Sequence, residues 1–159
     1  MKPNCRNIAI GPVLLTFVLF AITCTPSRAA AINDSVPAPE FIAQLELKAA
    51  QAKPREQCFL YTELVHSMTQ LAGKQFVDGD IEAASATLKK VEHYAQLIHM
   101  NLANDTKKLK DAEMLMHHTT VRLSDFLHQA SSDDRPVLQA TLKQLDHVHD
   151  ELLTQVFAH

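Results

Sequence analysis

Apolar residues recur every seven positions through the second half of the chain. One series runs from Ile81 to Ala130, and a second runs from Ala84 to Phe126, three residues out of step with the first. Together they make the a/d pattern of a helix that packs against partners with a left-handed supercoil. Because neither glycine nor proline interrupts them, we expect one continuous helix of about 50 residues, about 75 Å long. A break at residues 104–106, which would fold this helix into two arms, is the alternative.

Apolar stripes at helical spacing flank this long helix. Pro54 separates the two stripes that precede the long helix. This proline either kinks one helix or begins a new one with proline in the first turn. Asp78-Gly79-Asp80 predicts a tight turn in which Asp80 caps the next helix. The second helix should fold back antiparallel on the first half of the long helix, and the last helix on its second half. The flanking helices are expected over Pro39–Ala52, Arg55–Val77 and Pro136–Phe157.

The composition agrees with a fold built of helices alone. Ala, Leu, Gln, Lys and Glu, which are strong helix formers, dominate the chain. Strand-type alternation of apolar and polar residues is absent. We therefore expect an all-α protein, an antiparallel helical bundle of coiled-coil hairpins built around the long central helix. Residues 39–159 should form a single helical domain, a length that suits one hydrophobic core.

The N-terminal residues have the pattern of a secretory signal. It consists of a basic start, an uncharged apolar run over Ile8–Cys24 and small residues up to Ala31. Signal peptidase would cut after Ala31 or after Ala29. We expect residues 1–31 to be a signal peptide and residues 32–38 a short leader, so that the protein is exported to a periplasm or secreted.

Two other interpretations of this segment stay open. The apolar run is close to the shortest length that spans a bilayer, so an uncleaved anchor is one of them. Lipid attachment at Cys24 is the other, although Ala21-Ile22-Thr23 matches poorly the residues that precede a lipidated cysteine. If the signal is cleaved, we expect no membrane insertion of the mature protein.

The charge of the mature chain excludes some partners. The signal contains Lys2, Arg6 and Arg28, so 12 of the 15 basic residues remain against 18 acidic ones, a net charge of −6 with neutral histidine. No basic patch favours nucleic acid, and an anionic membrane surface would repel this chain mildly.

Cys58 is the single cysteine expected after cleavage, which excludes an intramolecular disulfide. Cys58, Val65 and Ala72 recur on one helix face. This spacing favours a small buried core residue. An intermolecular disulfide in an oxidising compartment is the alternative.

Residues 71–92 resemble the helix hairpin of tetratricopeptide-type repeats. The resemblance rests on Ala72-x-x-x-Phe76 followed by Gly79-Asp80-Ile81-Glu82-Ala83-Ala84. It covers about one hairpin, whose helices are too long for a two-helix repeat unit of about 34 residues, and no second copy is visible. The resemblance implies a helical surface that binds a peptide or a protein.

The nine histidines raise the question of metal binding, and Met114 with His118 is the main candidate. These two residues are four apart on one outer helix face, and their sulfur and imidazole donors are those that copper and similar soft ions prefer. A solvated surface without metal is the competing interpretation. Glu63-x-x-His66 has the spacing found in di-iron bundles, but the chain has no second Glu-x-x-His. We expect no resident cofactor, with copper or a similar soft metal as the alternative.

His149 interrupts the apolar stripe of the last helix. Antiparallel pairing around a turn near residues 133–135 places His149 opposite Thr119, a polar residue in the stripe of the long helix. A buried polar group without a partner costs about 1–3 kcal/mol. We therefore expect a buried hydrogen bond between Thr119 and His149 that fixes the register of the two helices.

The chain lacks the sequence patterns of common hydrolases and haem proteins. It has no Gly-x-Ser-x-Gly elbow, no His-Glu-x-x-His and no Cys-x-x-Cys-His. We expect a secreted or periplasmic helical binding or scaffold protein, not an enzyme. It should form a homodimer or bind a protein partner along residues 81–105, where the apolar stripe has few neighbours. A periplasmic metal-binding bundle of the copper type, with His and Met donors, is the alternative, and an enzyme with an unrecognised site is a third class.

Overall fold

The described chain is helical almost throughout. The computed structural model describes residues 36–102 and 107–158. Every regular element within these residues is a helix, which confirms the expected all-α class. The helices are α1 (Pro39–Gln51), α2 (Pro54–Val77), α3 (Ile81–Asn101), α4 (Leu109–Gln129) and α5 (Arg135–Ala158).

The boundaries of α2 follow from the residues that flank it. Lys53, the residue before Pro54, has an extended backbone, so the proline begins a new helix and does not kink a continuous one. At the other end, Gly79 adopts a φ of 80°, which glycine tolerates without steric cost. Asp80 then caps α3, because its Oδ1 accepts a hydrogen bond from the Ala83 N–H at 3.2 Å.

The expectation of one continuous helix over residues 81–130 is wrong. α3 ends at Asn101 and α4 begins at Leu109. The connecting segment, residues 102–108, is one heptad long. The seven-residue pattern therefore continues in phase from α3 into α4 although the chain leaves the helix between them. Periodicity alone could not reveal this break.

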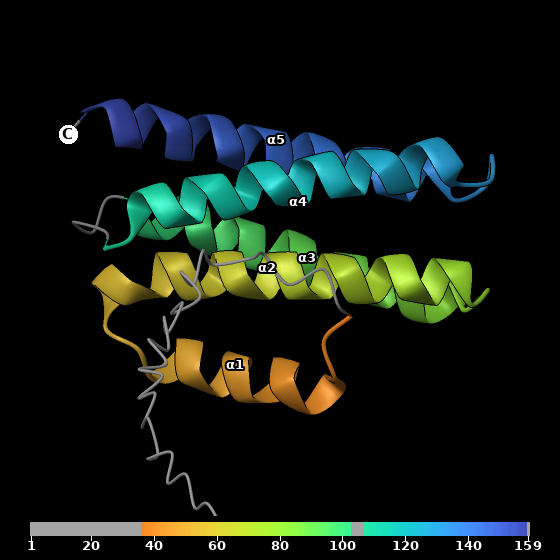
Figure 1. Ribbon diagram of the computed structural model, residues 1–159, viewed down its shortest axis with the longest axis horizontal. Helices are drawn as coiled ribbons and strands as arrows, with labels where there is room; N and C mark the ends of the chain where they lie inside the picture. Colours follow the sequence, from red (N-terminus) through yellow and green to blue (C-terminus); the bar gives the residue numbers. More distant parts are fainter. Residues whose placement is uncertain (1–35, 103–106, 159) are drawn as a thin grey trace, which may run out of the picture. The chain divides into compact units, whose positions relative to one another are not determined.

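The helices α2 to α5 form two hairpins. α2 pairs with α3, and α4 pairs with α5, while α4 also lies beside α2 and α5 beside α3 (Figure 1). Glu56, near the start of α2, contacts Lys107, just before α4. His66, further along α2, contacts Thr119, further along α4, so the two helices are parallel. The hydrogen bonds between α3 and α5 give the same direction. The hairpins thus lie side by side in the same orientation, and α1 packs on α2.

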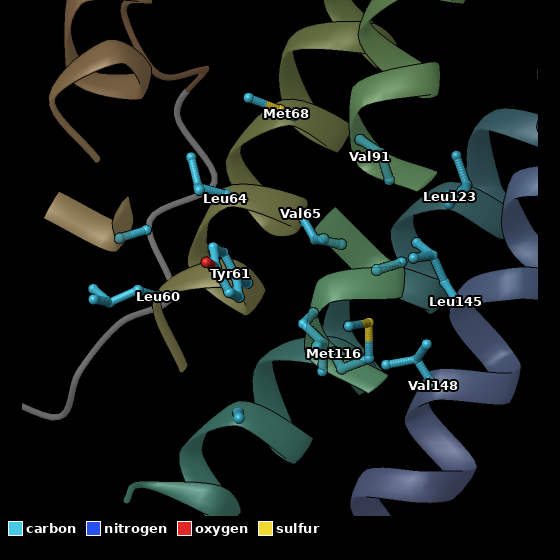
Figure 2. Packing of buried hydrophobic residues seen from close by; sticks show 14 of the residues in the cluster. Leu60, Tyr61, Leu64, Val65, Met68, Val91, Met116, Leu123, Leu145 and Val148 are labelled. Atoms are coloured by element: carbon cyan, nitrogen blue, oxygen red, sulfur yellow. The ribbon is translucent and has the colours of Figure 1, made fainter. Parts of the chain in front are cut away.

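The core lies between the four helices of the two hairpins. Figure 2 shows side chains from all four meeting there. Burial of each large aliphatic side chain contributes about 1.5–3 kcal/mol. The core residues that are at most 2% exposed include Leu64, Val65, Met68, Leu88, Val91, Ile98, Met116, Leu123, Leu138, Leu145, Val148 and Leu152.

The apolar stripe of α3 is covered from Ala84 to Ile98, while Ile81 at its start is 40% exposed. Its residues Ala84, Leu88, Val91, Ala95 and Ile98 are 0% exposed, because α2 and α5 pack against this helix. The expected homodimer or partner along residues 81–105 assumed that the stripe was partly bare. That reason for association at α3 no longer applies.

Some expectations concern residues that lie outside the described ranges. These are the signal peptide over residues 1–31, the alternative lipid site at Cys24 and the break at residues 104–106. Within the described ranges, none of the helices combines the length and the apolar character needed to cross a bilayer.

Candidate functional site

A buried polar layer joins α2 to α4. Thr119 donates its hydroxyl hydrogen to the Leu115 carbonyl oxygen at 2.7 Å, so its Oγ1 accepts from Nδ1–H of His66 at 2.9 Å. Nε2 of His66 then accepts from the Gln70 amide at 3.0 Å. His66, Gln70 and Thr119 are at most 8% exposed. Because buried polar groups are costly without partners, this layer fixes the register of α2 on α4.

The predicted hydrogen bond between Thr119 and His149 is therefore not formed. His149 instead contacts Glu113, with Nε2 3.1 Å from Oε1, and its ring lies 5.2 Å from that of His117. The reason is that α4 has two neighbours. Thr119 faces α2, where it bonds to His66. Glu113 and His117, on a different side of α4, contact His149 of α5. The prediction assumed that α5 alone covered this stripe.

The proposed metal ligands Met114 and His118 have different surroundings. Met114 is 53% exposed. His118 is partly buried, and its ring lies 5.7 Å from that of His66. Its Nδ1 is shielded and has no hydrogen-bond partner within the described residues. No group of three His, Cys, Asp or Glu side chains in residues 36–102 and 107–158 is arranged to hold a metal ion.

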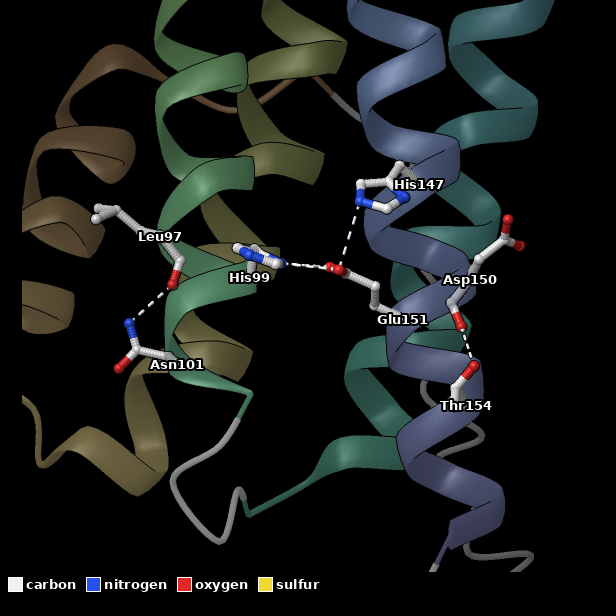
Figure 3. Close-up of polar contacts among 7 residues, drawn as sticks. All are labelled: Leu97, His99, Asn101, His147, Asp150, Glu151 and Thr154. Carbon is white, nitrogen blue, oxygen red and sulfur yellow. Dashed lines mark hydrogen bonds and ion pairs between the residues drawn. The ribbon is translucent and has the colours of Figure 1, made fainter.

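A second histidine cluster joins α3 to α5 in an open groove of about 400 Å³. Figure 3 shows His99 and His147 pointing at the carboxylate of Glu151. Nδ1 of His99 lies 2.8 Å from both carboxylate oxygens, and Nε2 of His147 lies 3.4 Å from Oε1. The two imidazoles are 59% and 71% exposed. Such exposed pairs contribute little stability, so their geometry is not needed to hold the hairpins together.

A third cluster surrounds a cavity of about 350 Å³ between α1, α2 and the start of α4. We name this cavity the lysine pocket. Its lining combines apolar side chains with charges of both signs. It is lined by Lys48, Glu56, Phe59, Leu60, Glu63, Lys107 and Lys108.

Three contacts attach the start of α4 to the lysine pocket. The Lys107 N–H donates to the Arg55 carbonyl oxygen at 2.8 Å, and its ammonium lies 3.2 Å from Glu56. The Lys108 ammonium lies 4.4 Å from the centre of the Phe59 ring, within the range of a cation–π interaction. Lys108 also adopts the left-handed backbone conformation, with a φ of 57°. For a residue other than glycine this conformation costs about 1–2 kcal/mol.

Glu63 is the carboxylate in the lysine pocket that lacks a complete set of contacts. Its Oε2 is shielded from solvent and has no hydrogen-bond partner within the described part of the chain. Burial raises the pKa of Glu63, while the positive charges of Lys48 and Lys108 act to lower it. The lysines thus act on this carboxylate through charge.

Cys58 has no role that requires exposure. Its side chain is 0% exposed in the core, and burial raises the pKa of the thiol to about 12. A neutral, buried thiol is neither a nucleophile nor accessible to a second chain. The structure thus favours the core residue over an intermolecular disulfide.

Sequence reasoning did not find the lysine pocket. Glu63 was considered only as an iron ligand together with His66, but His66 bonds to Thr119 whereas Glu63 faces the pocket. One signal was present: Glu63 is the sole charged residue in the stretch Leu60–Gln70, which is otherwise buried throughout. The lysines come from helices that are distant in sequence, so no local motif could unite them.

Comparison with known proteins gives no assignment: no protein-family model, no curated protein and no solved structure matches this chain.

Proposed function

We propose that the protein is an exported helical binding protein and that the lysine pocket is its ligand site. Export is supported by the N-terminal signal pattern. The binding role is supported by one observation above all, the coincidence of apolar side chains, three lysines and two glutamates around one cavity. Ligand sites commonly combine a mostly apolar lining with a few polar groups that fix orientation.

The charges favour an anionic ligand. Three lysines and two glutamates line the lysine pocket, so it carries one excess positive charge when all are ionised. The mature chain as a whole is expected to be negative. A locally positive cavity on a negative protein attracts small anions while the rest of the surface repels them.

Calorimetric titration of the exported protein with phenylacetate tests this proposal, because this probe joins one apolar ring to one carboxylate. We expect a Kd tighter than about 1 mM, which corresponds to about −4 kcal/mol. Lys48→Gln with Lys108→Gln should weaken binding at least about tenfold, since each charge-assisted contact contributes about 1.5–3 kcal/mol.

The matched control is Lys89→Gln with Lys143→Gln, which removes the same charge at two exposed positions away from the lysine pocket. This control should keep the wild-type affinity. Equal weakening in both double variants would mean that the net charge of the protein, and not the pocket, governs binding. Absence of binding to the wild type would refute the proposed function.

Metal binding through Met114 and His118 is a second candidate function, favoured by the Nδ1 atom of His118, which has no hydrogen-bond partner within the described residues. Thioether and imidazole donors suit Cu(I) and similar soft ions. Titration with Cu(I) should then give binding that Met114→Ala with His118→Ala abolishes and that His128→Ala, at an exposed position on α4, preserves. Absence of binding to the wild type would refute this second function.

A further inference from the structure

We infer that α1 is a movable wall of the lysine pocket: it leaves α2 while α2 to α5 stay packed, and an anion in the cavity holds it in place. The second part of this inference rests on the proposed function, because it describes how the same cavity is occupied. The first part depends only on how α1 is attached to the bundle.

α1 is the least attached of the described helices. It packs on α2 alone, whereas each of the other four helices packs on at least two neighbours (Figure 1). Its buried residues are Ile42, Leu45 and Ala49, while Phe41 and Leu47 are 51% and 63% exposed. A helix of 13 residues is marginal on its own. Elements with few buried apolar contacts open locally at a lower free energy than the whole protein unfolds.

The junction between α1 and α2 has the features of a hinge. Ala52 and Lys53 both have extended backbones, so the two helices do not continue into each other. Pro54, the first residue of α2, has no N–H to donate back into α1. Rotation about the backbone of Ala52 would break the hydrogen bond of 3.3 Å from Gln57 to the Ala49 carbonyl oxygen, but it would leave the helical bonds of α2 intact. Hinges are commonly a few residues at the end of an element.

Side-chain contacts with α3 fasten α1 in its observed position. Glu46 Oε1 accepts a hydrogen bond from the Tyr94 hydroxyl at 3.1 Å and lies 3.8 Å from the Lys90 ammonium. The Tyr94 ring stacks on Tyr61, with 5.8 Å between the ring centres. Because this stack holds the ring, Tyr94→Phe removes the hydrogen bond to α1 and keeps the aromatic contact.

The position of α1 changes the lysine pocket through Lys48. Lys48 is the residue that α1 contributes to the lining, while Lys107 and Lys108 directly precede α4. Lys107 is fastened to α2 by its N–H bond to the Arg55 carbonyl oxygen, so it stays when α1 leaves. Departure of α1 thus removes one of three positive charges from the cavity. An anion is attracted more strongly when α1 is docked, and a ligand shifts an equilibrium towards the state that it binds better.

Native-state hydrogen exchange of the exported protein, followed for each amide by NMR, tests the movement. We expect the amides of α1 to exchange at least about tenfold faster than buried amides of α5, at a rate that low urea concentrations leave unchanged. Tyr94→Phe should accelerate exchange in α1 about tenfold, the effect of losing one hydrogen bond to a charged group. Equal rates with equal urea dependence in α1 and α5 would refute a separate opening, and so would exchange in α1 that Tyr94→Phe does not change.

Thr141→Val is the matched control, because it also removes a hydroxyl that donates to a glutamate of another helix. Thr141 of α5 donates to Glu92 Oε1 of α3 at 2.8 Å. This bond stays intact when α1 leaves, so Thr141→Val should accelerate exchange in α5 and leave α1 unchanged. Equal acceleration in both helices would show that α1 opens only when the whole protein unfolds, and it would refute the inference.

Phenylacetate tests the coupling between α1 and the cavity. At ten times its Kd it should slow exchange in α1 by up to about tenfold, and Lys48→Gln should remove most of this slowing. If phenylacetate binds but slows only the amides that need global unfolding, the coupling is refuted and the proposed function stands. If phenylacetate does not bind, the proposed function and the coupling fail together, and the results for Tyr94→Phe and Thr141→Val alone decide whether α1 opens.

Discussion

Gly73 lies where α2 and α4 approach each other closely. A Cβ atom at this position would lie 2.1 Å from Cζ of Phe126, well inside van der Waals contact. Gly73 is buried within α2, near the C-terminal end of the helix. At a position within a helix, glycine lowers stability relative to alanine by about 1 kcal/mol. Its small size is thus a requirement of packing and not of backbone conformation.

Gly73→Ala should destabilise the protein by about 1–3 kcal/mol, because the Phe126 ring must leave its place. Gly73→Ala combined with Phe126→Leu should recover much of this loss, since the shorter side chain leaves room for the methyl group. Urea unfolding followed by circular dichroism measures both. A stable single variant would show that the hairpins lie farther apart than described.

Glu63 should make stability depend on pH. Its pKa is raised by burial from the ordinary value of 4.5, so the carboxylate ionises less readily in the folded than in the unfolded chain. The stability linked to its protonated form is fully present below the unfolded pKa and is lost as the pH rises through the folded pKa.

Glu63→Gln should therefore raise the midpoint of thermal unfolding at pH 7, and this gain should shrink as the pH falls towards 4. Asp125→Asn serves as the reference for loss of an exposed carboxylate. A gain that is the same at pH 4 and pH 7 would contradict desolvation of Glu63 as the cause.

Cys58 should resist modification in the folded state. Burial raises the pKa of its thiol to about 12, so the thiolate that reacts with iodoacetamide is scarce at neutral pH. We expect alkylation only above the urea concentration that unfolds the protein. Rapid alkylation of the native protein, or a disulfide-linked dimer on a non-reducing gel, would show that Cys58 is accessible.

At the level of helices, the sequence predicts most of the fold because local signals are strong. Pro54 marks the start of α2, and Asp80 marks the cap of α3. The break between α3 and α4 was only the alternative to a continuous helix, for a specific reason: a connecting segment one heptad long leaves the apolar phase intact, and no glycine or proline marks the turn. Lys108 takes the left-handed conformation that glycine would normally occupy.

Lys108→Gly should therefore stabilise the protein by at most about 1 kcal/mol. Glycine adopts this conformation without the steric cost, but the substitution also removes the cation–π contact with Phe59. Lys110→Gly, two residues further along in α4, should destabilise it by about 1 kcal/mol, since glycine there lies within a helix. Urea unfolding compares the two. If both variants lose stability equally, the backbone at Lys108 is helical, and this result would support the continuous helix expected from the sequence.

At the scale of the whole molecule, the pairing of the hairpins was beyond sequence reasoning. A heptad pattern shows that a helix has a buried face, but it does not identify the helices that cover that face. For this reason we expected Thr119 to bond to His149 of α5, whereas in the structure it bonds to His66 of α2. The lysine pocket depends on the same long-range pairing, because its lining comes from α1, α2 and the residues that begin α4.

The central claim is that ligand binding takes place in the lysine pocket. Backbone amide shifts in ¹H–¹⁵N spectra during titration with phenylacetate test it most directly, since they locate the ligand independently of affinity. The account predicts that the largest shifts fall at Lys48, Phe59, Leu60, Glu63 and Lys108. Largest shifts at His99 and Glu151 in the groove between α3 and α5, or the absence of saturable shifts, would contradict it.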